Sequence, residues 1–181
     1  MARNIEIKAR VADRATLVDR VEAVAGPAVA ELRQDDTFFH CGHGRLKLRD
    51  FGDATGELIA YARPDTTEPS LCDYERSPTD DPAALRATLT RALGELARVV
   101  KARWLYQAGR TRIHIDRVAG LGDYMELEVV LADGDTLADG QAEAKSLMRE
   151  LAIDPADLCA MAYVDMLLAE PSAVGRHGSA G

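Results

Sequence analysis

Charged side chains occupy every second position in five stretches of the sequence. They are Glu6, Lys8 and Arg10; Arg45, Lys47 and Arg49; Lys101 and Arg103; Arg110, Arg112, His114 and Asp116; and Glu126 and Glu128. The positions between them are almost all apolar. Because side chains two residues apart on a strand share a face, each stretch is expected to form a strand with one charged and one apolar face.

The way in which these charges are sorted suggests a binding site. One such strand alone is more simply explained by a solvated outer face, but cations dominate four of the five faces. Arginine forks match phosphate oxygens, lysine supplies a point charge, and Mg²⁺ is bound through a few carboxylates together with substrate phosphates. The combination indicates a barrel with a charged lumen that holds a triphosphate and a divalent metal, and with helices covering its apolar exterior.

The elements that would position these side chains are mostly strands. Strand-like patterns cover residues 3–11, 29–39, 45–51, 57–63, 71–76, 96–107, 110–118 and 124–132. Helices are predicted over 14–25, 80–93 and 136–151, with a last short helical stretch from 155 to 169. Many strands joined by hairpin-like turns indicate a largely antiparallel α+β fold, and closure into a barrel would remove exposed edges.

Three further features concern packing. Trp104 and Tyr106 lie on the apolar side of their strand, so we expect them under a helix. Gly120 and Gly122 predict a tight hairpin turn and not a phosphate-binding loop, because no helix follows them. His114 lies on a charged face, where it is either a polar group near substrate or metal, or a hydrogen-bonded structural histidine.

Composition excludes several classes of protein. The 181 residues include 30 acidic and 22 basic side chains, a formal net charge of −8, which disfavours a nucleic-acid partner. No apolar run is long enough to span a membrane, and the charged, alternating first residues do not resemble a signal peptide. Three scattered cysteines do not suggest a disulfide framework. We therefore expect a cytoplasmic protein with one domain over residues 1–170 and a disordered tail over 171–181.

Several motifs together resemble the CYTH superfamily, the triphosphate tunnel metalloenzymes. They are NIEIK at 4–8, GRLKLRD at 44–50, LIAYARPD at 58–65, KARWLY at 101–106, RIHID at 112–116 and GLGDYMELE at 120–128. They span about residues 3–132 and are most similar to the bacterial class IV adenylate cyclase branch. The resemblance implies a closed tunnel of eight antiparallel strands that binds a triphosphate with Mg²⁺ or Mn²⁺.

The resemblance also implies roles for individual residues. The implied metal ligands are Glu6, Glu126 and Glu128, and the implied catalytic residues are Lys8, Asp116 and Glu126. The implied phosphate ligands are Lys8, Lys47, Arg49, Arg63, Lys101, Arg103 and Arg112. An alternative role for Asp116 is to balance the charge of neighbouring arginines. Asn4 stands where the family motif begins with glutamate, and Ser70 and Cys72 replace a cation and a serine.

Three functions fit this pattern. The first is the conversion of ATP to cyclic AMP and pyrophosphate by an adenylate-cyclase-like enzyme. The second is metal-dependent hydrolysis of tripolyphosphate, thiamine triphosphate or a nucleoside triphosphate. The third is a sensor that binds a triphosphate or nucleotide without catalysis. In each case the partner is a small triphosphate; a homodimer is compatible with the sequence, and no nucleic acid or membrane is expected.

Overall fold

The computed structural model describes residues 2–62 and 66–169. Its strands are β1 (Ala2–Arg10), β2 (Ala30–Phe39), β3 (Arg45–Asp50), β4 (Gly56–Ala62), β5 (Ser70–Thr79), β6 (Glu95–Ala108), β7 (Thr111–Val118) and β8 (Gly122–Val130). Its α-helices are α1 (Arg14–Ala25), α2 (Pro82–Leu93), α3 (Leu137–Glu150) and α4 (Tyr163–Ala169). The eight predicted strands are confirmed, and their boundaries differ from the prediction by at most three residues.

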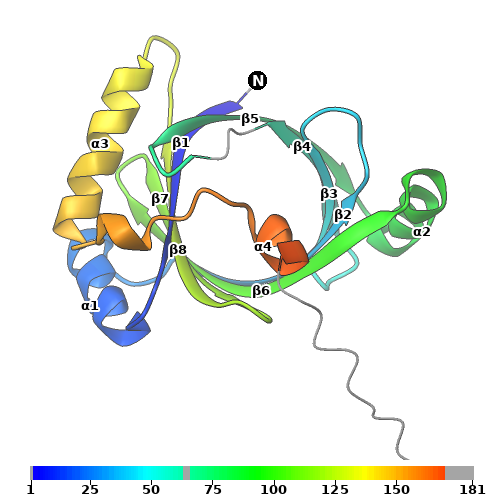
Figure 1. Cartoon of the computed structure of the whole chain (residues 1–181), viewed down its shortest axis with the longest axis horizontal. Helices are drawn as coiled ribbons and strands as arrows, with labels where there is room; N and C mark the ends of the chain where they lie inside the picture. Colours follow the sequence, from blue (N-terminus) through cyan, green and yellow to red (C-terminus); the bar gives the residue numbers. More distant parts are fainter. Residues whose placement is uncertain (1, 63–65, 170–181) are drawn as a thin grey trace, which may run out of the picture.

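The eight strands form a closed antiparallel barrel in the order β1-β5-β4-β3-β2-β6-β7-β8. Figure 1 looks along the axis of this barrel. Alternation dictates the arrangement: the odd-numbered apolar residues of β1, such as Ile5 and Ile7, are buried outside the barrel, while Glu6 and Lys8 face its interior. The predicted fold class, a closed eight-stranded barrel with helices on its exterior, is confirmed.

Helices α1 and α3 cover the outer face of strands β1, β6, β7 and β8 on one side of the barrel (Figure 1). Leu17 and Val21 of α1 and Leu147 of α3 pack with Ile113, Leu127 and other apolar residues of the strands. Tyr106 belongs to this core and Trp104 packs against it, as predicted. The apolar strand faces are therefore buried by helices, which leaves the charged faces to line the lumen.

The end of the chain differs from the predicted continuous helical stretch. Pro155–Asp157 form one turn of 3₁₀-helix, and α4 begins only at Tyr163. Between them the chain follows the barrel wall, where the amide of Cys159 donates to the carbonyl oxygen of Lys8 over 2.9 Å. This pairing with β1 takes the chain out of helical geometry and leads α4 across one opening of the barrel (Figure 1).

Glycines permit two close features of the architecture. Gly120 and Gly122 adopt φ angles of 82° and 99° in the β7–β8 hairpin, which confirms the predicted tight turn. Gly140 of α3 lies so close to the barrel that a Cβ there would be 2.7 Å from Ile5 Cγ1 and 2.8 Å from Leu131 Cδ2. Helix α3 can therefore approach β1 and β8 closely.

Among the described residues, no helix is long and apolar enough to cross a membrane. The predicted tail at 171–181 lies outside the described residues, and so does Arg63. The domain boundary at residue 170 therefore stays a prediction.

Candidate active site

The barrel encloses a cavity of about 360 Å³ that is lined by side chains from all eight strands and from the segment leading into α4. Its charged lining residues are Glu6, Lys8, Asp36, Lys47, Arg49, Glu57, Arg76, Lys101, Arg103, Arg112, Glu126 and Glu128. A larger hollow of about 750 Å³ lies beside α4 and includes Arg45 and Asp165. We place the candidate site in the smaller cavity, because the sorted charges converge there.

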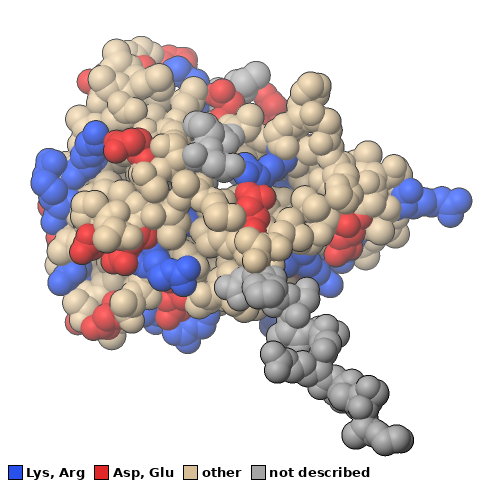
Figure 2. Space-filling model, viewed as in Figure 1, with Lys and Arg blue, Asp and Glu red and all other residues tan. Residues whose placement is uncertain are grey.

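The lumen is close to electrically balanced in the described part of the chain. Its seven cationic side chains face five lining carboxylates and a sixth, Asp116, that lies buried behind them. This corrects the simpler picture of a lumen dominated by cations: interior carboxylates partner most of them. On the molecular face in Figure 2, by contrast, basic and acidic side chains are scattered among other residues.

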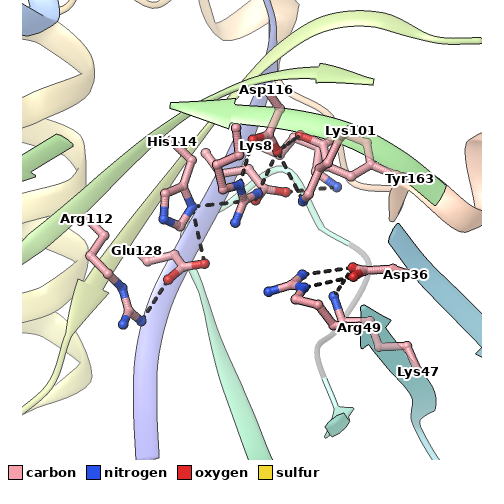
Figure 3. A network of polar contacts seen from close by, with 12 residues as sticks. Lys8, Asp36, Lys47, Arg49, Lys101, Arg112, His114, Asp116, Glu128 and Tyr163 are labelled. Atoms are coloured by element: carbon pink, nitrogen blue, oxygen red, sulfur yellow. Dashed lines mark hydrogen bonds and ion pairs between the residues drawn. The ribbon is translucent and has the colours of Figure 1, made fainter. Parts of the chain in front are cut away.

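Three residues form a candidate metal centre on β7 and β8. His114, Glu126 and Glu128 each offer one ligand atom, and these atoms all lie within 4.8 Å of one another. The Nδ1 atom of His114 is 3.5 Å from Glu128 Oε1 (Figure 3). It is 3.9 Å from Glu126 Oε2. This Nδ1 is buried and makes no hydrogen bond in the described structure. A buried nitrogen that makes no hydrogen bond and lies beside two carboxylates fits a divalent cation.

The protonation states of this cluster also suit a cation. Burial would raise the pKa of Glu126, but the charge of Arg103 outweighs it and holds that pKa well below its usual range. Burial similarly opposes ionisation of Glu128, whose pKa is nevertheless lowered by Arg112 and, in the acidic range where the imidazole is protonated, by His114. Burial and the charge of Arg103 lower the pKa of His114, so its imidazole is neutral at pH 7. Two carboxylates and a free imidazole lone pair are thus available.

Glu6 lines the same cavity but is not part of the three-residue cluster. Glu6 stands directly opposite Glu128 in the backbone register of β1 and β8, so the two acids occupy neighbouring positions. Asn4 also lines the cavity; it is 2% exposed, and its Oδ1 has no hydrogen-bond partner among the described residues. The resemblance implies Glu126 and Glu128 as metal ligands, a role that stays a prediction, and the sequence leaves the contribution of His114 undecided.

Lys8 is held where β1 meets the segment leading into α4. Its ammonium lies 3.5 Å from Glu126, donates to the carbonyl oxygen of Met161 over 3.1 Å and sits 3.9 Å from the centre of the Tyr163 ring. The Tyr163 hydroxyl in turn donates to Asp116 over 3.0 Å. The segment that closes one end of the barrel is therefore tied directly to the candidate site.

Lys47 and Arg49 share a carboxylate that the sequence patterns missed. Asp36 of β2 is 2% exposed and accepts hydrogen bonds from Lys47 Nζ at 2.7 Å and from Arg49 Nε and Nη2 at 2.8 Å each. Burial would raise its pKa, but Arg49 and Lys47 hold that pKa far below the usual range. Strand parity places Asp36 on the same face as Leu32 and Phe38, but only the structure shows that this face lines the cavity.

Lys101 and Arg103 have an equivalent partner in Asp116. This carboxylate is fully buried and accepts from Arg103 Nε at 2.6 Å and from Lys101 at 3.3 Å. The charges of Arg103 and Lys101 outweigh its burial and lower the pKa of Asp116 to about 2. Arg103 also contacts Glu126, so it links Asp116 to the candidate metal centre.

The remaining cations of the charged strand faces lie in three different places. Arg112 lies in the cavity and pairs with Glu128 at 2.8 Å. Arg45 pairs with Asp165 of α4 at 2.6 Å at the covered end of the barrel. Arg10 is exposed beside the Tyr124 ring, and Arg110 pairs with Asp135 and Glu143 near α3. Grouping Arg10 and Arg110 with the lumen was wrong, because both lie where their strands leave the barrel.

A closed barrel with ion-paired lysines and arginines around an acidic cluster defines a class of tunnel proteins. The CYTH domain model matches residues 2–163, so the chain belongs to the CYTH family. A search of curated proteins finds no match.

Solved structures share the fold at low sequence identity. The PH1012 protein of Pyrococcus horikoshii is 20% identical, with a TM-score of 0.79 over 90% of this chain and 98% of its own. A candidate adenylate cyclase of Vibrio parahaemolyticus is 19% identical, with a TM-score of 0.74 over 92% of this chain and 98% of its own. A candidate adenylyl cyclase from Hippeastrum that reveals a dominant triphosphatase activity is 13% identical, with a TM-score of 0.61. The match covers 93% of this chain and 94% of that one. At these identities the likeness establishes the fold.

Proposed function

We propose that this protein is a metal-dependent enzyme that binds a nucleoside triphosphate in the barrel and converts ATP to cyclic AMP and pyrophosphate. The observation that carries the proposal is the juxtaposition, in one cavity, of a three-residue metal cluster with the paired cations Lys47, Arg49, Lys101 and Arg103. Anionic phosphates with their divalent metal are the ligands that such a set recognises.

The candidate metal ligands are His114, Glu126 and Glu128, with Glu6 as a neighbouring acid. When bound there, a divalent cation would neutralise phosphate charge. Carboxylates suit Mg²⁺ and Mn²⁺, whereas an imidazole nitrogen suits transition metals, so the set favours Mn²⁺ over Mg²⁺.

The residues of the chain would act mainly through position and charge. In the cyclase reaction the ribose 3′-hydroxyl attacks the α-phosphorus and pyrophosphate leaves. Lys8, Lys101 and Arg103 lie on the side of the cavity that includes Glu126, where they would stabilise charge that develops on the leaving group. Asp116 contributes by holding Lys101 and Arg103. Lys47, Arg49, Lys101 and Arg103 are already hydrogen-bonded to Asp36 and Asp116, so these four side chains need little reorganisation during the reaction.

Two orphaned amide oxygens favour a nucleotide over inorganic tripolyphosphate. Asn4 Oδ1 and Gln34 Oε1 are buried, line the cavity and have no hydrogen-bond partner in the described structure. A buried acceptor without a donor is costly, and ionised phosphates offer acceptors only. Ribose hydroxyls or a base amino group would supply the missing donors.

A second candidate, metal-dependent triphosphate hydrolysis, is favoured by the size of the cavity. Its volume of about 360 Å³ lies at the lower end of the range of roughly 300–1,000 Å³ for ligand pockets. A triphosphate alone would fill much of this space. The fold likeness to the Hippeastrum protein is compatible with this reaction.

Product analysis distinguishes these functions. The full-length protein is incubated with ATP and Mn²⁺ or Mg²⁺, and the products are separated by chromatography and identified by mass spectrometry. Cyclic AMP with pyrophosphate would support the proposal, whereas ADP or AMP with phosphate would establish hydrolysis instead. Tight triphosphate binding without turnover would indicate a sensor and overturn both enzymatic functions.

A matched pair of variants ties the reaction to the metal cluster. Glu126→Gln should lower turnover by at least 100-fold, because it removes a charged ligand from a buried site. Glu143→Gln makes the same chemical change on α3, where Glu143 pairs with Arg110 outside the barrel, and should leave turnover unchanged. Equal turnover in both variants would contradict the assignment of Glu126.

A further inference from the structure

Two cation pairs of the lumen are built on the same plan. Each is a Lys-x-Arg sequence on one strand, Lys47 to Arg49 on β3 and Lys101 to Arg103 on β6. In each case one buried aspartate on the neighbouring strand stands directly opposite the arginine: Asp36 opposite Arg49, and Asp116 opposite Arg103. The lysine then pairs with the residue two positions beyond the aspartate. We call each set a Lys-x-Arg/Asp triad.

The first triad holds its cations from several sides. Arg49 uses its Nε and one terminal nitrogen on Asp36, which leaves its other edge toward the cavity that it lines (Figure 3). Lys47 donates to the same carboxylate, and its ammonium lies 5.6 Å from the ring centres of both Phe38 and Tyr61. These contacts restrict the conformations that the side chains of Lys47 and Arg49 can adopt in the lumen.

The second triad repeats this geometry on the next two strands of the barrel, with its cations on β6 and its aspartate on β7. Arg103 again uses Nε and one terminal nitrogen on the aspartate, Asp116, and Lys101 donates to the same group. A hydrogen bond from Tyr163 completes the set of donors. The two triads lie next to each other because β2, which carries Asp36, pairs with β6, which carries Lys101 and Arg103.

The two aspartates are poorly suited to exchange partners. Each has a short side chain fixed by strand register and almost fully buried, with 2% exposure for Asp36 and 0% for Asp116. Both oxygens of each carboxylate already accept charge-assisted hydrogen bonds, which are about twice as strong as neutral ones. A buried ion released from such a pair would be left uncompensated at high cost.

We propose that Asp36 and Asp116 are positioning residues that preassemble two adjacent phosphate clamps, each made of a Lys-x-Arg pair. This inference rests on the proposed function, since it assumes that the lumen binds a triphosphate. In this proposal the aspartates act on the cations and not on the substrate or the metal. They fix the orientation of Arg49 and Arg103 and the position of the Lys47 and Lys101 ammonium groups, so that binding does not have to order four long side chains.

The chain provides a matched test on adjacent residues. Asp35 precedes Asp36, points out of the barrel and pairs with Arg98. Tripolyphosphate binding is measured by calorimetry with Mn²⁺ for wild type, Asp36→Asn and Asp35→Asn, after thermal unfolding has shown that each variant is folded. We expect at least a tenfold loss of affinity in Asp36→Asn and no change in Asp35→Asn. Equal or tighter binding by Asp36→Asn would overturn the proposal, because the carboxylate would then compete with phosphate.

A pH profile separates positioning from a general loss of structure. Burial and the charge of Arg49 lower the pKa of Lys47 to about 8, while Asp36 raises it; Lys101 is a further cation that lowers it. Affinity for tripolyphosphate should therefore fall above pH 8 in wild type, where Lys47 loses its proton. Without the Asp36 charge this decline should begin at lower pH. A uniform loss of affinity with an unchanged profile would contradict a positioning role.

A second measurement applies even if Asp36→Asn does not fold. In a crystal structure of the wild-type protein with tripolyphosphate, both aspartates should keep their hydrogen bonds to the arginine and lysine of their triads. Departure of these cations from Asp36 and Asp116 toward the phosphates would overturn the proposal. If wild type does not bind tripolyphosphate or ATP at all, the proposed function itself fails, which is a distinct result.

Discussion

Asp35 and Asp36 are adjacent in the sequence and have opposite environments. Asp35 forms an outer ion pair with half-exposed Arg98, whereas Asp36 is buried against Lys47 and Arg49. Exposed ion pairs contribute little to stability, but a buried carboxylate that loses its partners is costly. At the scale of single residues, strand parity thus decides whether an acid belongs to the solvated surface or to the candidate site.

His114 provides the sharpest prediction at this scale. Its buried, unpartnered Nδ1 lies beside Glu126 and Glu128, so His114→Ala should weaken Mn²⁺ binding by at least tenfold. Binding is followed by electron paramagnetic resonance of Mn²⁺ titrated with protein, in the absence of nucleotide. His43→Ala, at an exposed position of the β2–β3 loop, is the control and should bind Mn²⁺ as wild type does. Unchanged binding by His114→Ala would leave this histidine a purely structural role.

At the scale of elements, close packing overrides local propensity in α3. Gly140 is unfavourable in the middle of a helix, yet it allows α3 to contact Ile5 and Leu131 of the barrel. The same helix begins with a capping box between Thr136 and Asp139, so its start is encoded locally while its middle is dictated by the strands beneath it.

Substitution of Gly140 by alanine should therefore destabilise the protein. The new Cβ would overlap buried side chains, and overpacking of this kind costs about 1–3 kcal/mol, more than the roughly 1 kcal/mol gained in helix propensity. Urea unfolding of Gly140→Ala should give a lower free energy of unfolding than wild type. The reverse change at exposed Ala142, Ala142→Gly, should also destabilise by about 1 kcal/mol, through propensity alone. A more stable Gly140→Ala variant would refute the close approach.

At the scale of the whole molecule, the lumen is nearly neutral before any ligand enters. Seven cations and six carboxylates surround the cavity in the described part of the chain, and several of them form direct pairs. The barrel must accommodate these groups in a region of reduced dielectric, where like charges repel strongly. Internal pairing lets the charged lumen stay folded without a polyanion.

Triphosphate binding should consequently depend on divalent metal. A triphosphate brings several negative charges into a lumen with almost no net positive charge, so additional cations must enter with it. We expect tripolyphosphate affinity, measured by calorimetry, to be at least tenfold weaker in EDTA than in Mn²⁺. Binding of equal strength in EDTA would mean that the protein cations alone compensate the charge, contrary to the pairing described.

The sequence predicts the properties that depend on local strand geometry better than those that depend on how the strands meet in the barrel. Period-two alternation identified the strands and placed Glu6, Lys8, Lys47, Arg49 and Glu126 on charged faces, because side-chain direction along a strand is a local property. It misplaced Arg10 and Arg110, since parity does not reveal where a strand leaves the barrel. It also overlooked Asp36, whose significance appears only when β2 lies between β3 and β6.

The sequence by itself determined which side chains share a strand face, where most helices begin and end, and, through its motifs, the family of the barrel. The tertiary structure decided which charges meet: Asp36 with Lys47 and Arg49, and His114 with Glu126 and Glu128. It also decided that the last helix crosses the end of the barrel and contacts Lys8 through Tyr163. Such contacts join strands far apart in the sequence, so they depend on barrel closure and register and not on local preference.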